Sequence, residues 1–314
     1  MNVTSYWKAL QEESSRVVVG LDDAMQLLTI ALFSGGHVLV EGVPGTGKTL
    51  LVKTLANLIQ GDFKRLQFTP DLMPSDIVGT SIFDLATTEF RVRTGPIFAN
   101  IVLTDEINRA PPKTQSALLE AMEERQVTID GISYPLPDPF MVAATQNPLE
   151  YEGTYPLPEA QLDRFQFKAL VDYRSAGDEE EVLRRHRGGT SPEAVSSDLR
   201  SVVTPEAVVA ARRGAEDVRV DDVVISYATA IARASRQSPD LNLGGSPRAS
   251  IAVIRGARVR ALMNGRDFVI PDDVKALVPA AYRHRIQLKA EAEIQGLTPD
   301  EAVARILDSV EVPR

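Results

Sequence analysis

Short apolar runs alternate with amphipathic, helix-like segments over the first two thirds of the chain. Three of these runs, HVLV, IVLT and FMVAAT, are apolar at nearly every position, as expected for strands that helices cover on both faces. The predicted strands cover residues 37–40, 63–68, 101–104, 140–145 and 165–171. Helical patterns follow Gly47, Pro112 and Pro158. This alternation predicts an α/β domain with a mainly parallel sheet.

Two segments interrupt the alternation. Residues 69–99, between the second and third predicted strands, make a connection longer than most loops in compact domains, and such loops are usually functional. Residues 126–139 alternate apolar and polar positions about Asp130-Gly131, which predicts a β-hairpin.

The last third of the chain has a different pattern. The stretch GGTSPEAVSSD at 188–198 is typical of a linker, and no strand pattern returns after it. Helix-like segments cover about 205–213, 221–236, 247–263 and 271–282. Two of them begin with proline and acids in the first turn. We therefore expect an α/β domain at 1–190 and a small all-helical domain at 191–314.

Composition narrows the class of protein. The chain has 34 basic and 43 acidic residues, a formal net charge of −9 and a pI near 5.0. This acidity argues against a nucleic-acid binder, because neutralising phosphates requires a basic surface. The absence of cysteine excludes disulfides, thiolate metal sites and cysteine nucleophiles. The amino terminus lacks the apolar core of a signal peptide, and no apolar run approaches the ~20 residues that span a bilayer, so we expect a soluble, cytoplasmic protein.

A phosphate-binding loop is predicted where the strand HVLVE meets the sequence GVPGTGKT and a helical pattern. Glycines at 42, 45 and 47 would let backbone N–H groups turn inward around phosphate oxygens. Lys48 would supply a positive charge to the β- and γ-phosphates, and the Thr49 hydroxyl would bind Mg²⁺. The predicted phosphate-binding residues are Gly42, Val43, Pro44, Gly45, Thr46, Gly47, Lys48, Thr49 and Leu50.

Polar side chains follow two other predicted strands. If the strand that ends in Asp105 and Glu106 neighbours the strand before the phosphate loop, both acids lie at the edge where open α/β sheets bind ligands. Asp105 would then hold Mg²⁺ through water, and Glu106 would polarise the attacking water. The strand FMVAAT delivers Asn147 to the same edge, where it would orient the water or contact the γ-phosphate. Helix caps and turns would account for the same residue types.

Three arginines are candidates for more distant contacts. Arg164 precedes the fifth strand, on the far side of the sheet from the phosphate loop, so it would reach a neighbour's nucleotide in a ring as an arginine finger. A salt bridge with Asp163 or Glu159 is the alternative. Arg248 lies in the first turn of a helix and would fold back onto the γ-phosphate, or else face solvent. Arg109 is a weaker candidate for a contact across a subunit boundary, with packing on the surface of its own subunit as the alternative.

Taken together, the motifs GVPGTGKT, TDEINRAPPKTQSALLEAMEE, ATQNP, LPEAQLDRF and GGSPRAS resemble the MoxR family of AAA+ ATPases in order and spacing. The resemblance covers essentially the whole chain, and the second motif with QFTPDLMPSDIVG is more specific than the phosphate loop. It implies a three-layer AAA+ sandwich around a parallel five-stranded sheet, followed by a small helical lid. It also implies a role for each candidate residue: the Walker B pair Asp105 and Glu106, sensor 1 Asn147, the arginine finger Arg164, sensor 2 Arg248, and an adenine border at Val19 and Gly20.

The family resemblance also implies how such a protein works. Residues 80–93 correspond to the helix-2 insert and 126–139 to the hairpin before sensor 1, and in relatives these insertions project into the central pore of a ring. Members generally form hexamers, hydrolyse ATP with Mg²⁺, and act as chaperone-like factors that remodel or mature a protein substrate. They commonly work with a partner bearing a von Willebrand factor A domain, which here would be a separate polypeptide.

Two other functions remain open at the level of sequence. The chain would also suit a nucleotide-switched, ring-forming binding module in which turnover is incidental. A chelatase-like or DNA-directed AAA+ motor is a third possibility, since proteins with a similar helix-2 insert include chelatase subunits and helicases. Arg91 and Arg93 in the insert support it, and the acidic pI opposes it.

Overall fold

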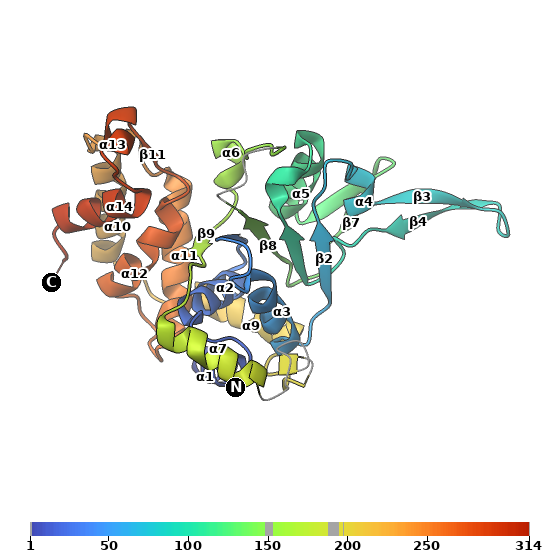
Figure 1. The fold of residues 1–314 in the computed structure, drawn as a ribbon, viewed down its shortest axis with the longest axis horizontal. Helices are drawn as coiled ribbons and strands as arrows, with labels where there is room; N and C mark the ends of the chain where they lie inside the picture. The colour runs from blue at the N-terminus through green and yellow to red at the C-terminus, as the bar shows by residue number, and fades with distance from the viewer. Residues whose placement is uncertain (1, 148–152, 188–194, 197, 314) are drawn as a thin grey trace.

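The computed structural model describes residues 2–147, 153–187, 195–196 and 198–313. A five-stranded parallel sheet stands at the centre of the molecule (Figure 1). Its strand order is β2-β5-β8-β1-β9. Its strands are β1 (Val38–Glu41), β2 (Phe63–Gln67), β5 (Ile101–Asp105), β8 (Met141–Gln146) and β9 (Phe167–Leu170). All five predicted strands are confirmed, and each differs by no more than one or two residues from its expected bounds.

The strand that ends in Asp105 is not the neighbour of the strand before the phosphate loop, as our expectation for the two acids assumed. The strand that carries Asp105, β5, does not neighbour β1, because β8 lies between them and pairs with both. The chain leaves β1 for the edge strand β2 and returns through β5 and β8. Since all five strands are parallel, their carboxyl ends still share one edge of the sheet. Asp105 therefore reaches the edge that carries the phosphate loop although its strand is not adjacent.

Helices cover both faces of the sheet, because successive strand residues point to opposite sides. Val38 and Val40 of β1 pack on the side of the helices α1 (Val3–Ser15), α2 (Asp22–Ser34) and α3 (Lys48–Leu58). Leu39 points to the other side and joins the cluster that contains α5 (Pro112–Glu124). The three-layer sandwich that the family resemblance implies is thus present.

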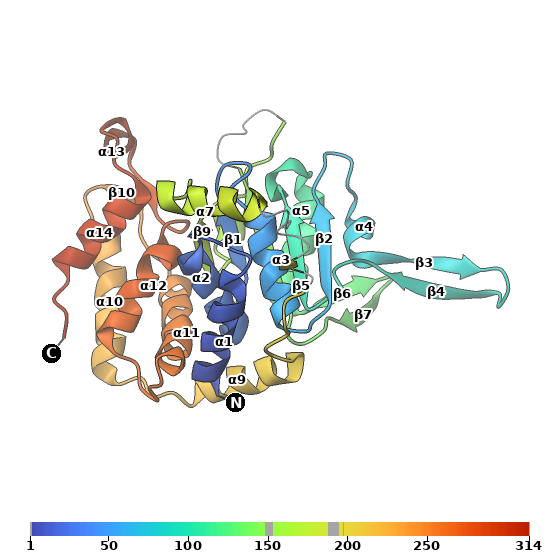
Figure 2. The ribbon, with the colours of Figure 1, turned by 60° about the horizontal axis from the view of Figure 1, so that its bottom comes forward.

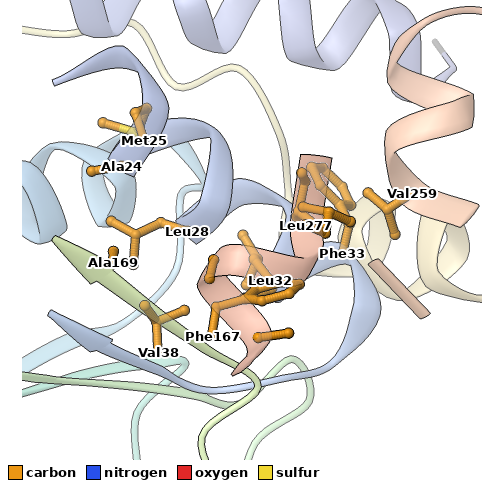
Figure 3. Close-up of a cluster of buried hydrophobic side chains, with 14 of the residues drawn as sticks. Ala24, Met25, Leu28, Leu32, Phe33, Val38, Phe167, Ala169, Val259 and Leu277 are labelled. Atoms are coloured by element: carbon orange, nitrogen blue, oxygen red, sulfur yellow. The ribbon is translucent and has the colours of Figure 1, made fainter. Parts of the chain in front are cut away.

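The hydrophobic core continues from the sheet into the carboxyl-terminal helices. Figure 3 shows Phe167 of β9, Leu32 of α2 and Leu277 of α12 (Pro271–Tyr282) in one buried cluster. Gly256 of α11 (Pro247–Met263) permits this approach, since a Cβ there would lie 2.7 Å from the Phe167 ring and 2.9 Å from Leu277. The carboxyl-terminal helices are therefore packed firmly onto the α/β domain.

Both irregular segments form antiparallel hairpins. In the long connection, α4 (Pro74–Val78) leads into β3 (Gly79–Asp84) and β4 (Glu89–Thr94), which project far from the rest of the molecule (Figures 1 and 2). The predicted second hairpin is confirmed as β6 (Gln126–Ile129) and β7 (Ile132–Pro135). Its turn places Asp130 and Gly131 at φ angles of 50° and 80°, as a tight hairpin turn with two left-handed residues requires.

The carboxyl-terminal domain is mainly helical, as expected. The four predicted helices are confirmed as α9 (Pro205–Glu216), α10 (Asp222–Gln237), α11 and α12. The structure adds α13 (Ala290–Ile294) and α14 (Pro299–Ser309), together with a small antiparallel pair, β10 (Leu241–Leu243) and β11 (Gln287–Leu288), which the all-helical expectation did not include. These strands are too short to give an alternating pattern. Two more helices, α6 (Glu159–Leu162) and α7 (Ala176–Arg187), flank β9 along the chain.

The predicted linker at 188–198 falls largely outside the described residues. Within the described part of the chain, none of the helices combines the length and the apolar character needed to cross a membrane.

Candidate active site

The predicted phosphate loop joins β1 to α3, which begins at Lys48. Gly45 and Gly47 adopt φ angles of 81° and 90°, in the left-handed region that side chains with a Cβ disfavour. The Lys48 ammonium donates hydrogen bonds to the carbonyl oxygens of Gly42 and Val43, at 2.6 and 2.8 Å. The loop thus closes around its own lysine at the amino-terminal end of a helix, where anions bind favourably.

A cavity of about 640 Å³ brings the predicted residues of the sheet edge together. It is lined by six residues of the phosphate loop and the start of α3, by both acids of β5 and by the amide after β8: Pro44, Gly45, Gly47, Lys48, Thr49, Leu50, Asp105, Glu106 and Asn147. The Thr49 hydroxyl lies 3.5 Å from Asp105 Oδ1. Oxygen ligands of this kind suit Mg²⁺, so the donor set fits the metal that the family resemblance implies.

Thr145 positions the two acids relative to each other. Its buried hydroxyl donates to Asp105 Oδ1 at 3.1 Å and accepts the backbone N–H of Glu106 at 3.0 Å. Glu106 itself has φ 56° and ψ 51°, a left-handed conformation that is uncommon for a residue other than glycine. Backbone strain of this kind costs about 1–3 kcal/mol and often occurs at functional sites. Other non-glycine residues with a positive φ, such as Thr88 and Asp130, lie in hairpin turns, whereas Glu106 lines the cavity.

Two polar side chains of β2 reach the same acids, and the sequence did not suggest either of them. Arg65 forms an ion pair with Asp105 at 2.6 Å, and the Gln67 amide donates to Glu106 Oε2 at 2.8 Å. The parallel register places Gln67 directly beside Asp105. Only the pairing of β2 with β5 makes these residues relevant, and a single sequence does not contain that information. Arg109, which we considered for a contact across a subunit boundary, pairs with Glu106 at 2.9 Å.

The predicted adenine border lies beside the loop without lining the cavity. The carbonyl of Val19 accepts a hydrogen bond of 2.8 Å from Arg174 Nε. A terminal nitrogen of Arg174 would lie 2.8 Å from a Cβ built on Gly47. A Cβ built on Gly20 would lie 2.7 Å from Asp178 Oδ2, in the first turn of α7. Arg174 therefore holds the backbone at Val19 and lies beside Gly47 of the phosphate loop, and it is a further residue that sequence reasoning missed.

Arg164 and Arg248 lie together at the other end of the sheet. Both pair with Glu123 at the end of α5, through Arg164 Nη2 to Oε2 at 3.0 Å and Arg248 Nη2 to Oε1 at 2.8 Å. They line a cavity of about 340 Å³ with His37, which precedes the amino end of β1. Neither arginine lines the cavity of their own phosphate loop. Arg248 therefore does not fold back onto its own phosphate loop in this structure, because α11 packs beside the start of β9 and begins at the opposite edge of the sheet.

His37 is buried beneath this second cavity with both ring nitrogens engaged. Nδ1 accepts the backbone N–H of Val142 at 2.9 Å, and Nε2 lies 3.1 Å from the carbonyl oxygen of Met122, so Nε2 carries the proton. Desolvation, together with the positive charge of Arg125, lowers the His37 pKa from 6.5 to about 3.

The stability that neutral His37 contributes should depend on pH. Because the folded pKa lies below the unfolded value, this contribution is complete above pH 6.5 and is lost as the pH falls towards about 3. The free energy of unfolding should decrease over that interval, and an NMR titration should find native His37 still neutral at about pH 5. A native titration midpoint near 6.5 would contradict this assignment.

Fold and cavity together define a class of protein, the AAA-type nucleotide-binding domain followed by a lid. Comparison with known families agrees with this class. The family described as "ATPase family associated with various cellular activities (AAA)" matches residues 37–167, and the AAA lid domain matches residues 233–306.

Individual relatives narrow the class to one family. The chain is 43% identical over 311 residues to Chaperone MoxR1 of Mycobacterium tuberculosis, covering 96% of this chain and 81% of that protein. It is 50% identical over 302 residues to the uncharacterized protein YeaC of Bacillus subtilis, covering 96% and 93%. A crystal structure of a candidate ATPase from Cytophaga hutchinsonii matches with a TM-score of 0.90 and 40% identity, over 99% and 96% of the two chains. The chain belongs to the MoxR family of AAA+ ATPases.

Proposed function

We propose that this protein hydrolyses ATP to ADP and phosphate and uses the reaction to remodel or mature a protein substrate. The observation that carries the proposal is the convergence of Lys48, the acids Asp105 and Glu106, and Asn147 on one cavity at the carboxyl edge of the sheet. Family membership and the chaperone relative support the same function.

Each residue of the cavity has a distinct task in this mechanism. Backbone N–H groups of the loop and the Lys48 ammonium bind the phosphates, and Lys48 exchanges its two loop carbonyls for phosphate oxygens. Mg²⁺ would be held by Thr49 and, through water, by Asp105, and it neutralises phosphate charge when bound. Glu106 accepts a proton from the attacking water, which Asn147 orients.

Arg164 and Arg248 serve a neighbouring subunit in this proposal. Because they lie at the amino edge of the sheet, they would meet the nucleotide of an adjacent copy in a closed ring, for which we propose a hexamer. Guanidinium groups supplied in this way stabilise the charge that develops on the transferred phosphoryl group. Arg248, like Arg164, would then lie in a site between subunits.

The protein substrate would meet the β3–β4 hairpin. Four large apolar side chains near its tip are exposed, Ile82, Phe83, Leu85 and Phe90. Exposed apolar groups of this kind mark protein-binding surfaces. Together with a separate partner containing a von Willebrand factor A domain, this hairpin would couple ATP turnover to a protein client in the cytoplasm.

Replacing Lys48 tests the nucleotide site directly. We expect Lys48→Ala to weaken ATP binding by about 100-fold or more, since it removes a charge-assisted contact to phosphate worth roughly 3 kcal/mol. Titration with a fluorescent ATP analogue measures the effect. Lys64→Ala, at an exposed position of β2 outside the cavity, is the matched control and should bind as the wild type does. Equal affinity of both variants would refute the proposed site.

The shape of the loop gives a second, subtler test. A Cβ on Gly42 would lie 2.1 Å from the backbone oxygen of Val171, whereas a Cβ on Gly45 meets nothing within 4 Å. Gly42→Ala must therefore displace the loop, and we expect it to weaken ATP binding by about tenfold or more, that is, by roughly 1.4 kcal/mol. Gly45→Ala should cost only the left-handed strain of about 1–2 kcal/mol in stability. A larger loss of affinity in Gly45→Ala would contradict this account of the loop.

A further inference from the structure

Arg285 is a buried arginine of the lid that contacts the segment containing Arg164. It follows the end of α12 and is 8% exposed. The segment that it meets, residues 163–166, joins α6 to β9 and places Arg164 at the amino edge of the sheet. None of the roles proposed above uses Arg285.

The guanidinium of Arg285 places a hydrogen bond on each side of Arg164. Its Nε donates to Asp163 Oδ1 at 2.6 Å, and Nη2 donates to the carbonyl oxygens of Asp163 at 3.0 Å and Phe165 at 2.6 Å. Nη1 donates to the carbonyl oxygens of Gln166 at 3.0 Å and Ala281 at 2.6 Å. These contacts use all five N–H donors of an arginine. Four of the five acceptors belong to the segment around Arg164, so this side chain fixes the backbone immediately before and after Arg164.

Other groups of the lid hold the same segment. His284 Nε2 lies 3.0 Å from the carbonyl oxygen of Phe165, and the Ser246 hydroxyl lies 3.4 Å from Asp163 Oδ1. The side chain of Arg164 shares the Glu123 carboxylate with Arg248 of the lid. The Arg164 segment is therefore held to the lid at its backbone and, through Glu123, at its side chain.

We propose that Arg285 is a positioning residue for Arg164, which it holds in place so that the Arg164 guanidinium is presented to the nucleotide of the adjacent subunit. This inference rests on the proposed role of Arg164. It implies that the orientation of the lid in one subunit sets the position of the arginine that enters the next. Lysine cannot replace Arg285, because a single ammonium cannot reproduce five donors in a planar arrangement.

Mixing of subunits tests the inference. Arg285→Met should lower the rate of ATP turnover by about 10- to 100-fold, the scale expected when a catalytic group is displaced by about an ångström. Its affinity for ATP should stay within about twofold of the wild type, because its own phosphate loop is intact. Lys48→Ala subunits bind ATP too weakly for efficient turnover but keep the Arg164 segment intact. Mixing Arg285→Met subunits with them should therefore recover turnover, and mixing Arg164→Ala subunits with them should do the same.

Controls separate positioning from general damage to the lid. Arg266→Met breaks another arginine–aspartate pair of the lid, with Asp273 at 2.7 and 2.8 Å and far along the chain from Arg164. It should lower stability without giving a turnover defect that mixing can repair. If Arg285→Met does not fold, Asp163→Asn removes the charged acceptor at nearly constant shape and should give the same repairable defect in a milder form.

The outcomes are distinguishable. If mixing with Lys48→Ala subunits restores turnover to Arg164→Ala but not to a folded Arg285→Met or Asp163→Asn variant, the positioning role alone is overturned. Full turnover in those variants would overturn it as well. No recovery with Arg164→Ala would overturn the finger between subunits, and the positioning role would fall with it, while ATP binding at Lys48 would be unaffected.

Discussion

A Glu106→Gln variant is expected to bind ATP as tightly as the wild type and to lose turnover by about 10²- to 10⁴-fold, the range that a positioned general base contributes. Glutamine has nearly the same shape, so the hydrogen bond from Gln67 and the fold of the cavity should persist. What the amide cannot do is accept a proton from water. Phosphate release and equilibrium binding of a fluorescent ATP analogue, measured side by side, report the two properties.

The matched control is Glu124→Gln, which alters an exposed acid at the end of α5 away from the cavity. It should hydrolyse ATP at the wild-type rate. Hydrolysis by Glu106→Gln at that same rate would remove the assigned role. Because the variant should remain in its ATP-bound state, it would also serve as bait for the partner and the substrate.

An Arg164→Ala variant is expected to lose turnover by about 10³-fold or more while keeping its ATP affinity, as arginine fingers contribute 10³ to 10⁵ in rate. The arginine lies at the edge of the sheet opposite its own phosphate loop, so the deficit should be repairable from outside the subunit. Adding Lys48→Ala subunits should restore part of the rate, since an ATP-competent subunit then adjoins an intact finger. Turnover measured across a series of mixing ratios tests this.

Arg184→Ala is the control for Arg164→Ala, because Arg184 forms an exposed i,i+4 pair with Glu180 on α7 and such pairs contribute little. Its rate should match the wild type at every mixing ratio. Absence of recovery for Arg164→Ala at any ratio would count against a finger that acts between subunits.

The parts of this fold that sequence alone predicted are those encoded by neighbouring residues. The strands around Val38 and Ile101 are predictable from their continuous apolar runs. The hairpin turn is predictable from Asp130-Gly131, residue types that tolerate the left-handed conformation found there. Gly45, Gly47 and Lys48 follow a strand and open a helix at fixed spacing, so the loop was predictable as a unit.

What sequence did not predict depends on pairing between distant segments. The insertion of β8 between β5 and β1 follows from how the strands pair in the sheet. The contacts of Arg65 with Asp105 and of Gln67 with Glu106 likewise depend on strand pairing. The position of Arg248 followed from how α11 packs on the sheet, which helix periodicity does not specify. Arg285 was missed for the same reason, since its acceptors are mostly backbone oxygens far away along the chain.

Glu123 acts as a built-in counter-ion for Arg164 and Arg248, and this affects which anions they select. One carboxylate already balances half of the charge of the two guanidiniums. A monovalent anion such as chloride or a lone carboxylate therefore gains nothing by displacing it. A terminal phosphate carries more charge and more acceptor oxygens, so it can satisfy both arginines at once. We therefore expect this edge of an isolated subunit to bind chloride and simple carboxylates weakly and to bind the phosphates of a nucleotide more strongly.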